Sequence, residues 1–389
     1  MEHYPSAYTE GCAKYRLHDQ AAADNYIRHT IIGDPQLDPV LEELSSLPPK
    51  ELNRFVGAGI EQKQDVFRTA PQCLRNFFDD LKEPAWLDHS AFKPGVRAFH
   101  ANVVNIFAAF VAGVLIDGFS TLISKSFVQT GRIFDDGVRR LRQNNRHQLE
   151  IFWPGGLLRD GEGWKLSIRI RFVHARVRHL LSHSEEWDFD TYGTPISAAH
   201  LGYALACFSA RTLKHSVTLG SGYTREECES FCAVWRYAGY VMGIPETIIY
   251  TDEQDALKLY KVGSACEPPP SEDAIVMTNA LIRSAPLVAG ITDRDERAKL
   301  VKNTIYPVSR FLVGNTLADK LQFPKNSKFT MTHALLKFRL KNTLTQLMEK
   351  ITRQGGSNLV TAFGASLYES AGLSYDLPDH AHSDESSKW

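Results

Sequence analysis

The chain has 389 residues, of which 43% are hydrophobic and 23% are charged, and its formal net charge at pH 7 is −1. This composition is typical of a globular protein with a large core, and it lacks the basic stripe with interleaved aromatic residues that would indicate nucleic acid as a partner. Six cysteines without a C-x-x-C pair argue against a disulfide scaffold, a zinc ribbon and a thioredoxin-like redox site.

The N-terminal segment from Met1 to Pro5 is polar and acidic, and no apolar segment follows it. This pattern argues against a secretory signal. The most apolar stretch, residues 103–119, is interrupted by Asn105 and Asp117 and falls short of the roughly 20 residues that cross a bilayer. We therefore expect a buried core helix there, no transmembrane segment and a cytoplasmic location.

Helical patterns dominate the rest of the chain, and strand signals are weak. Helix starts are expected near residues 38 and 49, the first with Asp38 as the N-cap and Pro39 at the first helical position. Further helices are expected at 71–83, 95–117, 129–150, 163–183, 196–216, 224–242, 253–263, 271–286, 293–322 and 328–354. The expected fold is all-α: one large helical domain with a globin-like core bundle and additional helices around it.

The expected helix at 163–183 carries one histidine between two arginines. Positions i−3, i and i+4 of a helix lie nearly above one another, so Arg171, His174 and Arg178 share a face. Residues on or next to this face are apolar (Ile170, Val177, Leu181), and charged or polar residues point the opposite way (Arg169, Arg176, His179). Arginine is rarely buried without a partner, so the pattern calls for an anion.

A haem satisfies all three side chains, because its iron binds an imidazole and its propionates pair with guanidinium groups. The chain contains no C-x-x-C-H sequence, so a haem would be held noncovalently. The alternative for His174 is a core histidine bonded to a carboxylate. The alternative for Arg171 and Arg178 is a pair of structural salt bridges to buried acids.

Residues 130–245 carry an ordered set of motifs. These are Thr130-Gly131-Arg132, Arg139-Arg140-Leu141, Pro154-Gly155-Gly156-Leu157, Trp164 ahead of Arg169 to Ala175, Trp187-Asp188, Gly193-Thr194-Pro195-Ile196-Ser197, Phe208-Ser209 and Trp235 to Pro245. Together they resemble the latex clearing protein family, the b-type haem rubber oxygenases, and their relatives, which include the prenyl-cleaving oxygenase of mycophenolic acid biosynthesis.

The resemblance implies that His174 is the proximal ligand of a noncovalent haem b iron, with Arg171 and Arg178 as its supporting arginines. It implies Arg140 as an active-site arginine on the other side of the haem, for which a solvated helix face is the alternative. The family's lysine and threonine fall on Gln143 and Asn144.

The change from lysine to Gln143 affects the distal side of the iron, because an amide cannot ligate iron as an amine does. The distal position would then be open, water-bound or held by another group, and Asn144 could donate a hydrogen bond to dioxygen. The acidic base of the rubber oxygenases has no clear counterpart, since Asp117, Asp135 and Asp136 are nearby acids without a matching context.

We therefore expect a haem b-dependent oxygenase that cleaves a C=C bond in an isoprenoid or a similar unsaturated, lipid-like metabolite. Its expected partners are dioxygen and a small hydrophobic substrate, and an electron donor is a further candidate. The alternatives are a haem monooxygenase or peroxygenase on a hydrophobic metabolite, a non-catalytic haem or lipid carrier, and a helical protein that has lost the cofactor.

The expected organisation has four parts. Residues 1–91 form an N-terminal helical flank, and residues 92–250 form the haem-binding core bundle. Residues 251–374 form C-terminal helices that pack on this core, and residues 375–389 form a disordered tail.

Overall fold

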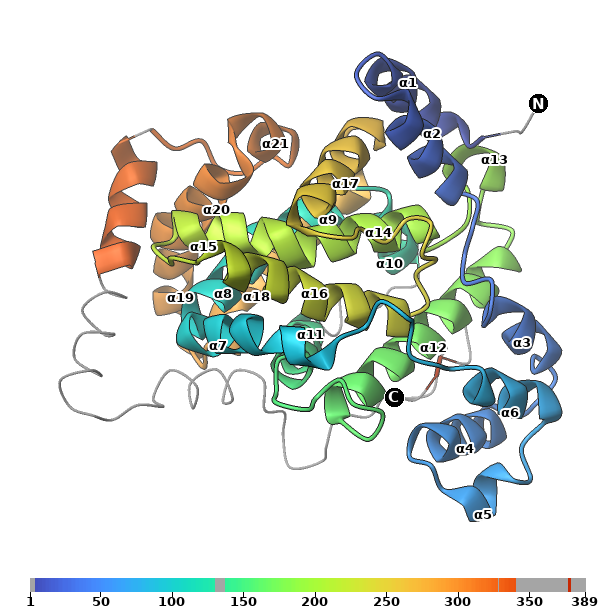
Figure 1. The fold of residues 1–389 in the computed structure, drawn as a ribbon. Helices are drawn as coiled ribbons and strands as arrows, with labels where there is room; N and C mark the ends of the chain where they lie inside the picture. The colour runs from blue at the N-terminus through green and yellow to red at the C-terminus, as the bar shows by residue number, and fades with distance from the viewer. Residues whose placement is uncertain (1–3, 130–136, 328, 341–376, 379–389) are drawn as a thin grey trace.

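The structure is a computed structural model that describes residues 4–129, 137–327, 329–340 and 377–378. Within these ranges the chain folds into helices joined by turns, and no strand is present among the described residues. Figure 1 shows an all-α arrangement, which confirms the predicted fold class. The boundaries proposed for the four parts of the chain stay predictions.

The α-helices are α1 (Ser6–Arg16), α2 (Gln20–His29), α3 (Asp38–Glu43), α4 (Pro49–Ile60), α5 (Gln64–Phe67), α6 (Gln72–Asp79), α7 (Lys93–Ala101), α8 (Val103–Ala109), α9 (Leu115–Phe119), α10 (Ile123–Gln129), α11 (Gly137–Ile151), α12 (Glu162–Ser182), α13 (Phe189–Tyr192), α14 (Ala198–Ala206), α15 (Thr212–Thr218), α16 (Arg225–Val241), α17 (Glu253–Cys266), α18 (Glu272–Val288), α19 (Arg294–Leu300), α20 (Tyr306–Val313) and α21 (Asn315–Lys320). Residues 329–340 are also helical.

Three long helices, α11, α12 and α16, pack on one another at the centre of the molecule. The start of α16 is fixed by a capping box, in which Thr224 and Glu227 each accept a hydrogen bond from the other's backbone N–H. One continuous cluster of buried apolar side chains extends from Tyr8 in α1 to Val288 in α18. In Figure 1 the N-terminal helices, in blue, cover one end of this core, and the C-terminal helices, in orange, cover the other.

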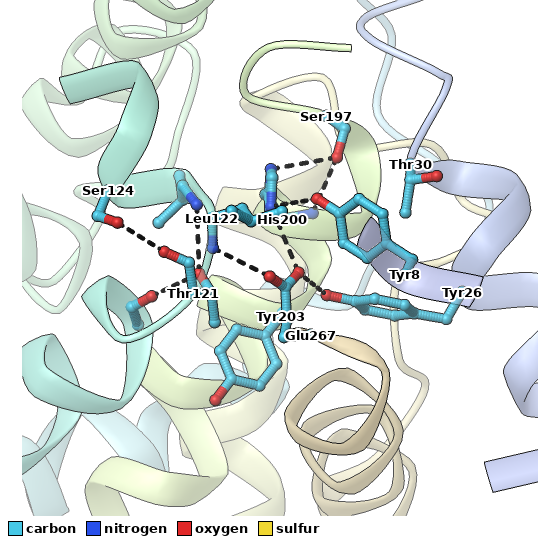
Figure 2. A network of polar contacts seen from close by, with 12 residues as sticks. Tyr8, Tyr26, Thr30, Thr121, Leu122, Ser124, Ser197, His200, Tyr203 and Glu267 are labelled. Atoms are coloured by element: carbon cyan, nitrogen blue, oxygen red, sulfur yellow. Dashed lines mark hydrogen bonds and ion pairs between the residues drawn. The ribbon is translucent and has the colours of Figure 1, made fainter. Parts of the chain in front are cut away.

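A buried polar network joins the N-terminal helices to this core (Figure 2). The Tyr8 hydroxyl lies 2.9 Å from His200 Nε2, and the Tyr26 hydroxyl donates to Glu267 Oε1 at 2.8 Å. The other carboxylate oxygen of Glu267 accepts from the backbone N–H of Leu122 at 3.0 Å. Buried polar groups are costly unless they are paired, so these bonds fix how α1 and α2 sit on α14 and α17.

The helix expected at 95–117 is wrong in its detail. The chain bends by 83° between the segments His89–Ala101 and Val103–Phe119, at Asn102, and a π-helical segment (Phe110–Val114) separates α8 from α9. The helices expected at 196–216 and 293–322 also contain π-helical segments, at Cys207–Arg211 and Val301–Ile305. Among the described residues no single helix has the length and hydropathy to cross a membrane, although this bent pair meets that criterion when its two segments are taken together.

The predicted helix start near residue 38 is present, but the predicted cap is wrong. Helix α3 begins at Asp38 itself, and the residue before it, Leu37, makes no side-chain cap. Asp34 closes the turn that precedes α3, because its Oδ1 accepts hydrogen bonds from the backbone N–H groups of Gln36 and Leu37, each at 3.1 Å. The carboxylate of Asp38 accepts a hydrogen bond from the backbone N–H of Asp34 at 2.8 Å and also binds a side chain of α12, as described below.

Candidate active site

Helix α12 is the element on which the site is built. The sequence predicts it at 163–183, and the structure places it at Glu162–Ser182. Its buried face includes Trp164, Ile168 and Phe172, which anchor the helix in the core. Arg169 lies on the side away from His174, as the sequence pattern predicts, and pairs there with Glu61.

His174 of α12 lines a cavity that also touches α9, α10, α11, α14, α16 and α18. Most of the lining is apolar, with Ile170, Val173 and Val177 beside the histidine. The polar side chains on the wall are Ser126, Gln143, Asn144, His147, His174 and Trp235. The cavity therefore combines two imidazoles, two amides and an apolar surface, which is the composition of a cofactor or ligand site.

The structure brings Gln143 and Asn144 to the same cavity as His174, although 31 positions separate Gln143 from the histidine in sequence. Both amides come from α11, which packs directly against α12. Arg140 lies on the first turns of α11, but its side chain is outside the described part of the chain. The motif at 130–132 and the acids Asp135 and Asp136 also lie outside the described residues.

Arg171 and Arg178 do not line the cavity. Successive helical residues are about 100° apart, so these arginines lie about 40–60° to one side of His174. Ile170 and Val177 lie at similar angles on the other side of His174. The cavity is on that side, because both residues line it. The expectation that all three polar side chains face one ligand is not met.

Both arginines bind carboxylates of the N-terminal segment instead. The Nε of Arg171 donates to Asp34 Oδ2 at 2.5 Å and its Nη2 to Asp34 Oδ1 at 2.8 Å, a two-pronged pair in which both side chains are about 97% buried or more. Arg178 Nε donates to Asp38 Oδ2 at 2.9 Å. The structure thus shows the ion-pair alternative, and these pairs hold α12 against residues 34–38.

A glycine makes room for the Arg171 pair. Gly243 follows α16 with φ +80°, and a Cβ atom at this position would overlap both Asp34 Oδ2 and Arg171 Nε. We expect Gly243→Ala to lower the free energy of unfolding by about 2–4 kcal/mol, from left-handed strain together with displacement of the ion pair.

Urea unfolding followed by circular dichroism measures this effect, and Gly290→Ala is the matched control. Gly290 has nearly the same φ, +79°, and no atom lies within 4 Å of the added Cβ. The variant Gly290→Ala should therefore lose only the free energy of unfolding that the backbone strain costs. Equal losses in the two variants would contradict a role for Gly243 in accommodating the pair.

His147 is the residue that the sequence analysis missed. It lies one turn beyond Gln143 on α11 and is buried, and its Nε2 is 2.9 Å from Ser167 Oγ. The Ser167 hydroxyl donates its one hydrogen to the carbonyl oxygen of Gly163 at 2.7 Å. Ser167 must therefore accept from His147, which places the ring hydrogen on Nε2 and leaves Nδ1 as the acceptor. The spacing i, i+4 from Gln143 was the available signal.

Burial lowers the pKa of His147 to about 4, so its ring is neutral at pH 7. The unfolded chain has the ordinary histidine pKa of 6.5, so unfolding takes up a proton between these two values. Stability from this group is complete above pH 6.5 and is lost as pH falls toward 4. We expect the variant His147→Gln to lose less stability than the native chain between pH 7 and 4.5, as measured by urea unfolding at each pH; parallel curves would contradict this.

Trp235 closes the cavity from α16. Its indole stands against the ring of Phe208, with centroids 5.4 Å apart, and against His147 at 5.9 Å. The residue is 1% exposed, and its Nε1–H has no hydrogen-bond partner among the described residues. A buried donor of this kind on a cavity wall is suited to a polar atom of a bound molecule.

Asp117, one of the acids considered as a base, lies next to the cavity but is committed to a buried cluster. Its Oδ2 accepts from His215 Nε2 at 3.0 Å and lies 3.1 Å from Arg211 Nη2. Burial alone would raise the pKa of Asp117, but His215 and Arg211 outweigh burial and hold that pKa below its usual value. Its neighbour Gly118 is the residue that lines the cavity.

Comparisons with known proteins agree on one family. Residues 97–341 match the family model described as "ER-bound oxygenase mpaB/B'/Rubber oxygenase, catalytic domain". The rubber oxygenase of Streptomyces sp. (strain K30) is 24% identical over 233 residues, which are 56% of this chain and 54% of that protein. The chain thus matches about half the length of that relative.

Among solved structures, the chain is similar to latex clearing protein LCP in the closed state. The TM-score is 0.67 at 21% sequence identity, and the match covers 90% of this chain and 95% of that chain. At this identity the likeness establishes a shared fold. The family match includes α11, α12 and α16, but it begins after Asp34 and Asp38.

Proposed function

The chain belongs to the mpaB/B′/rubber oxygenase family, and we propose that it is a haem b-dependent oxygenase that cleaves a carbon–carbon double bond in a small hydrophobic substrate. Family membership makes the chain an oxygenase. The observation that carries the finer proposal is the position of His174 on a mostly apolar cavity, together with Gln143, Asn144 and His147. Dioxygen is the co-substrate of this reaction.

The residues of the cavity fit a noncovalent haem. His174 supplies an imidazole for the iron from a helix that the core and two ion pairs hold in place. The apolar wall suits the macrocycle, and the indole N–H of Trp235 is a buried donor without a partner among the described residues. Arg171 and Arg178 do not fit as propionate partners, because each is already paired with a carboxylate; we assign them the positioning of α12.

When bound, the haem supplies the iron chemistry that activates dioxygen. The chain supplies the surroundings. Apolar side chains exclude water from the reacting carbon atoms, and the amides of Gln143 and Asn144 offer donors and acceptors that orient a polar group on the substrate. His147 is neutral and Ser167 holds its ring through Nε2, so its Nδ1 can accept a hydrogen bond.

The proposed substrate is an isoprenoid or a similar unsaturated metabolite. Rubber, named for the Streptomyces relative, is a polyisoprene, and its repeating C=C bond is the shared chemistry. We propose a small molecule as the substrate, and a cytoplasmic location stays a prediction. The location itself is tested by cell fractionation.

The experiment that tests this function combines a spectrum with product analysis. Purified protein should show a Soret band at about 400–430 nm. Incubated with geranylgeraniol or squalene under ¹⁸O₂, it should yield paired carbonyl fragments that carry the label. Reactions with and without added reductant determine whether an electron donor is required.

Each alternative has its own outcome in this experiment. An alcohol or epoxide would replace the cleavage proposal with a monooxygenase or peroxygenase. Haem binding without turnover of any alkene tested would indicate a non-catalytic haem-binding protein. Colourless protein, recovered after expression with ample iron and haem precursor, would overturn the haem proposal itself.

A further inference from the structure

Three potential metal ligands meet on the face of α12 that points away from the cavity. They are Glu42 of α3 and the pair His179 and His183, which lie one turn apart at the end of α12. Glu42 Oε2 lies 3.0 Å from His179 Nδ1, and Glu42 Oε1 lies 3.7 Å from His183 Nε2. The three ligand atoms all lie within 4.8 Å of one another.

The orientation of His183 indicates what belongs between these atoms. Its Nδ1 lies 2.8 Å from the carbonyl oxygen of His179, and a carbonyl can only accept, so Nδ1 carries a hydrogen. In a neutral ring the lone pair is then on Nε2, which faces the Glu42 carboxylate. Two electron-rich atoms therefore face each other at 3.7 Å, an arrangement that a positive charge between them, either a proton or a metal ion, would stabilise.

We infer that Glu42, His179 and His183 form a binding site for Zn²⁺ or another divalent transition metal with the same ligand preference. Two histidines at i and i+4 on one helix with a carboxylate from a second element are a recurrent zinc ligand set. Ligands about 2.1 Å from a tetrahedral metal are about 3.4 Å apart, and small side-chain rotations bring the present atoms to that spacing. A water molecule would complete the coordination.

The surroundings of His179 favour its neutral form, which is the form that binds a metal. Burial lowers the pKa of His179, and the charges of Arg176 and His183 lower it further, against the opposing effect of Glu42. The bond from His183 Nδ1 to a backbone carbonyl is also the kind of support that orients metal-binding imidazoles.

A metal at this site would clamp α3 to α12. Helix α3 already touches α12 through Asp38, which binds Arg178, so the clamp would add a second point of attachment four residues further along α3. The site lies on the opposite face from His174 and does not depend on the haem. Its role would be structural, in the bracing of the helix that carries His174.

The site is tested by titrating zinc into the intact protein after a chelator has removed any bound metal. Isothermal calorimetry measures the binding, and competition with a chromophoric chelator gives the affinity independently. The native chain should bind one equivalent with release of protons. His183→Ala and Glu42→Gln should each weaken binding by about tenfold or more, whereas His18→Ala, at an exposed histidine outside the cluster, should not. His174→Ala should also bind zinc normally, which separates this site from the cavity.

Thermal unfolding gives a second readout. Saturating zinc should raise the Tm of the native chain and leave the Tm of His183→Ala unchanged. The inference is overturned if the native chain binds no zinc, or if His183→Ala and Glu42→Gln bind it as tightly as the native chain. In that case a proton on His183 supplies the positive charge, and the three residues form only a surface ion pair.

Discussion

Replacing His174 by alanine is expected to remove the haem from the purified protein, or to weaken haem binding by more than about tenfold, because the iron loses the imidazole that holds it. The Soret absorbance per mole of protein and the titration of haem-free protein with haemin measure the effect. Far-UV circular dichroism should stay native, because the rest of the buried face of α12 is intact.

Two further variants make this result specific. His174→Gly opens space for a free ligand, so added imidazole should restore the Soret band of that variant. His147→Gln should keep its haem, since His147 is proposed to accept a hydrogen bond through Nδ1 and not to bind the iron. A full, unshifted spectrum in His174→Ala would show that the iron ligand has been assigned wrongly, and loss of haem only in the His147 variant would identify the other cavity histidine.

Asp34→Asn is expected to destabilise the protein by about 3 kcal/mol or more, since it leaves the buried guanidinium of Arg171 without its counter-charge. The asparagine keeps the oxygen that caps the turn through Gln36 and Leu37, so the loss isolates the charge. Urea unfolding provides the measurement. The m-value should remain constant if the compactness of the folded and unfolded states is unchanged.

Asp38→Asn is the matched comparison, because the Asp38 carboxylate is 34% exposed and the Asp34 carboxylate 3%. Water can stabilise Arg178 in that variant, so its loss should be clearly smaller. The double replacement Asp34→Leu with Arg171→Met should recover most of the stability, because an apolar pair removes both buried charges. A loss of less than about 1 kcal/mol in Asp34→Asn would mean that Arg171 is not held by this pair.

Local sequence pattern was sufficient for α12. Its period and its apolar neighbours Ile170 and Val177 follow from 100° per residue, and the structure reproduces them. The side predicted to be polar carries Arg169, Arg176 and His179 but also the fully buried Phe172. Family resemblance pointed to Gln143 and Asn144, and the structure places both on the wall of the cavity. The proposed chemical roles of these residues stay predictions, as does the role of Arg140.

What the sequence could not provide is long-range pairing. Asp34 lies 137 residues from Arg171, and Asp38 lies 140 residues from Arg178, so no local periodicity connects them. His147 was missed for a related reason. Its burial and its bond to Ser167 arise from the packing of α11 on α12, whereas the run of arginines around position 140 suggests a solvated helix. The bend at Asn102 likewise interrupts an apolar stretch that reads as one helix.

The two arginine–aspartate pairs link the region that matches the family model, residues 97–341, to the segment before it. The family match begins at residue 97, which suggests a self-sufficient module. A polypeptide that starts there would nevertheless carry two interior cations whose counter-ions had been cut away. The segment that carries Asp34 and Asp38 is therefore better regarded as an inseparable part of the fold than as an appendage, and truncation at the family boundary should destabilise the protein strongly.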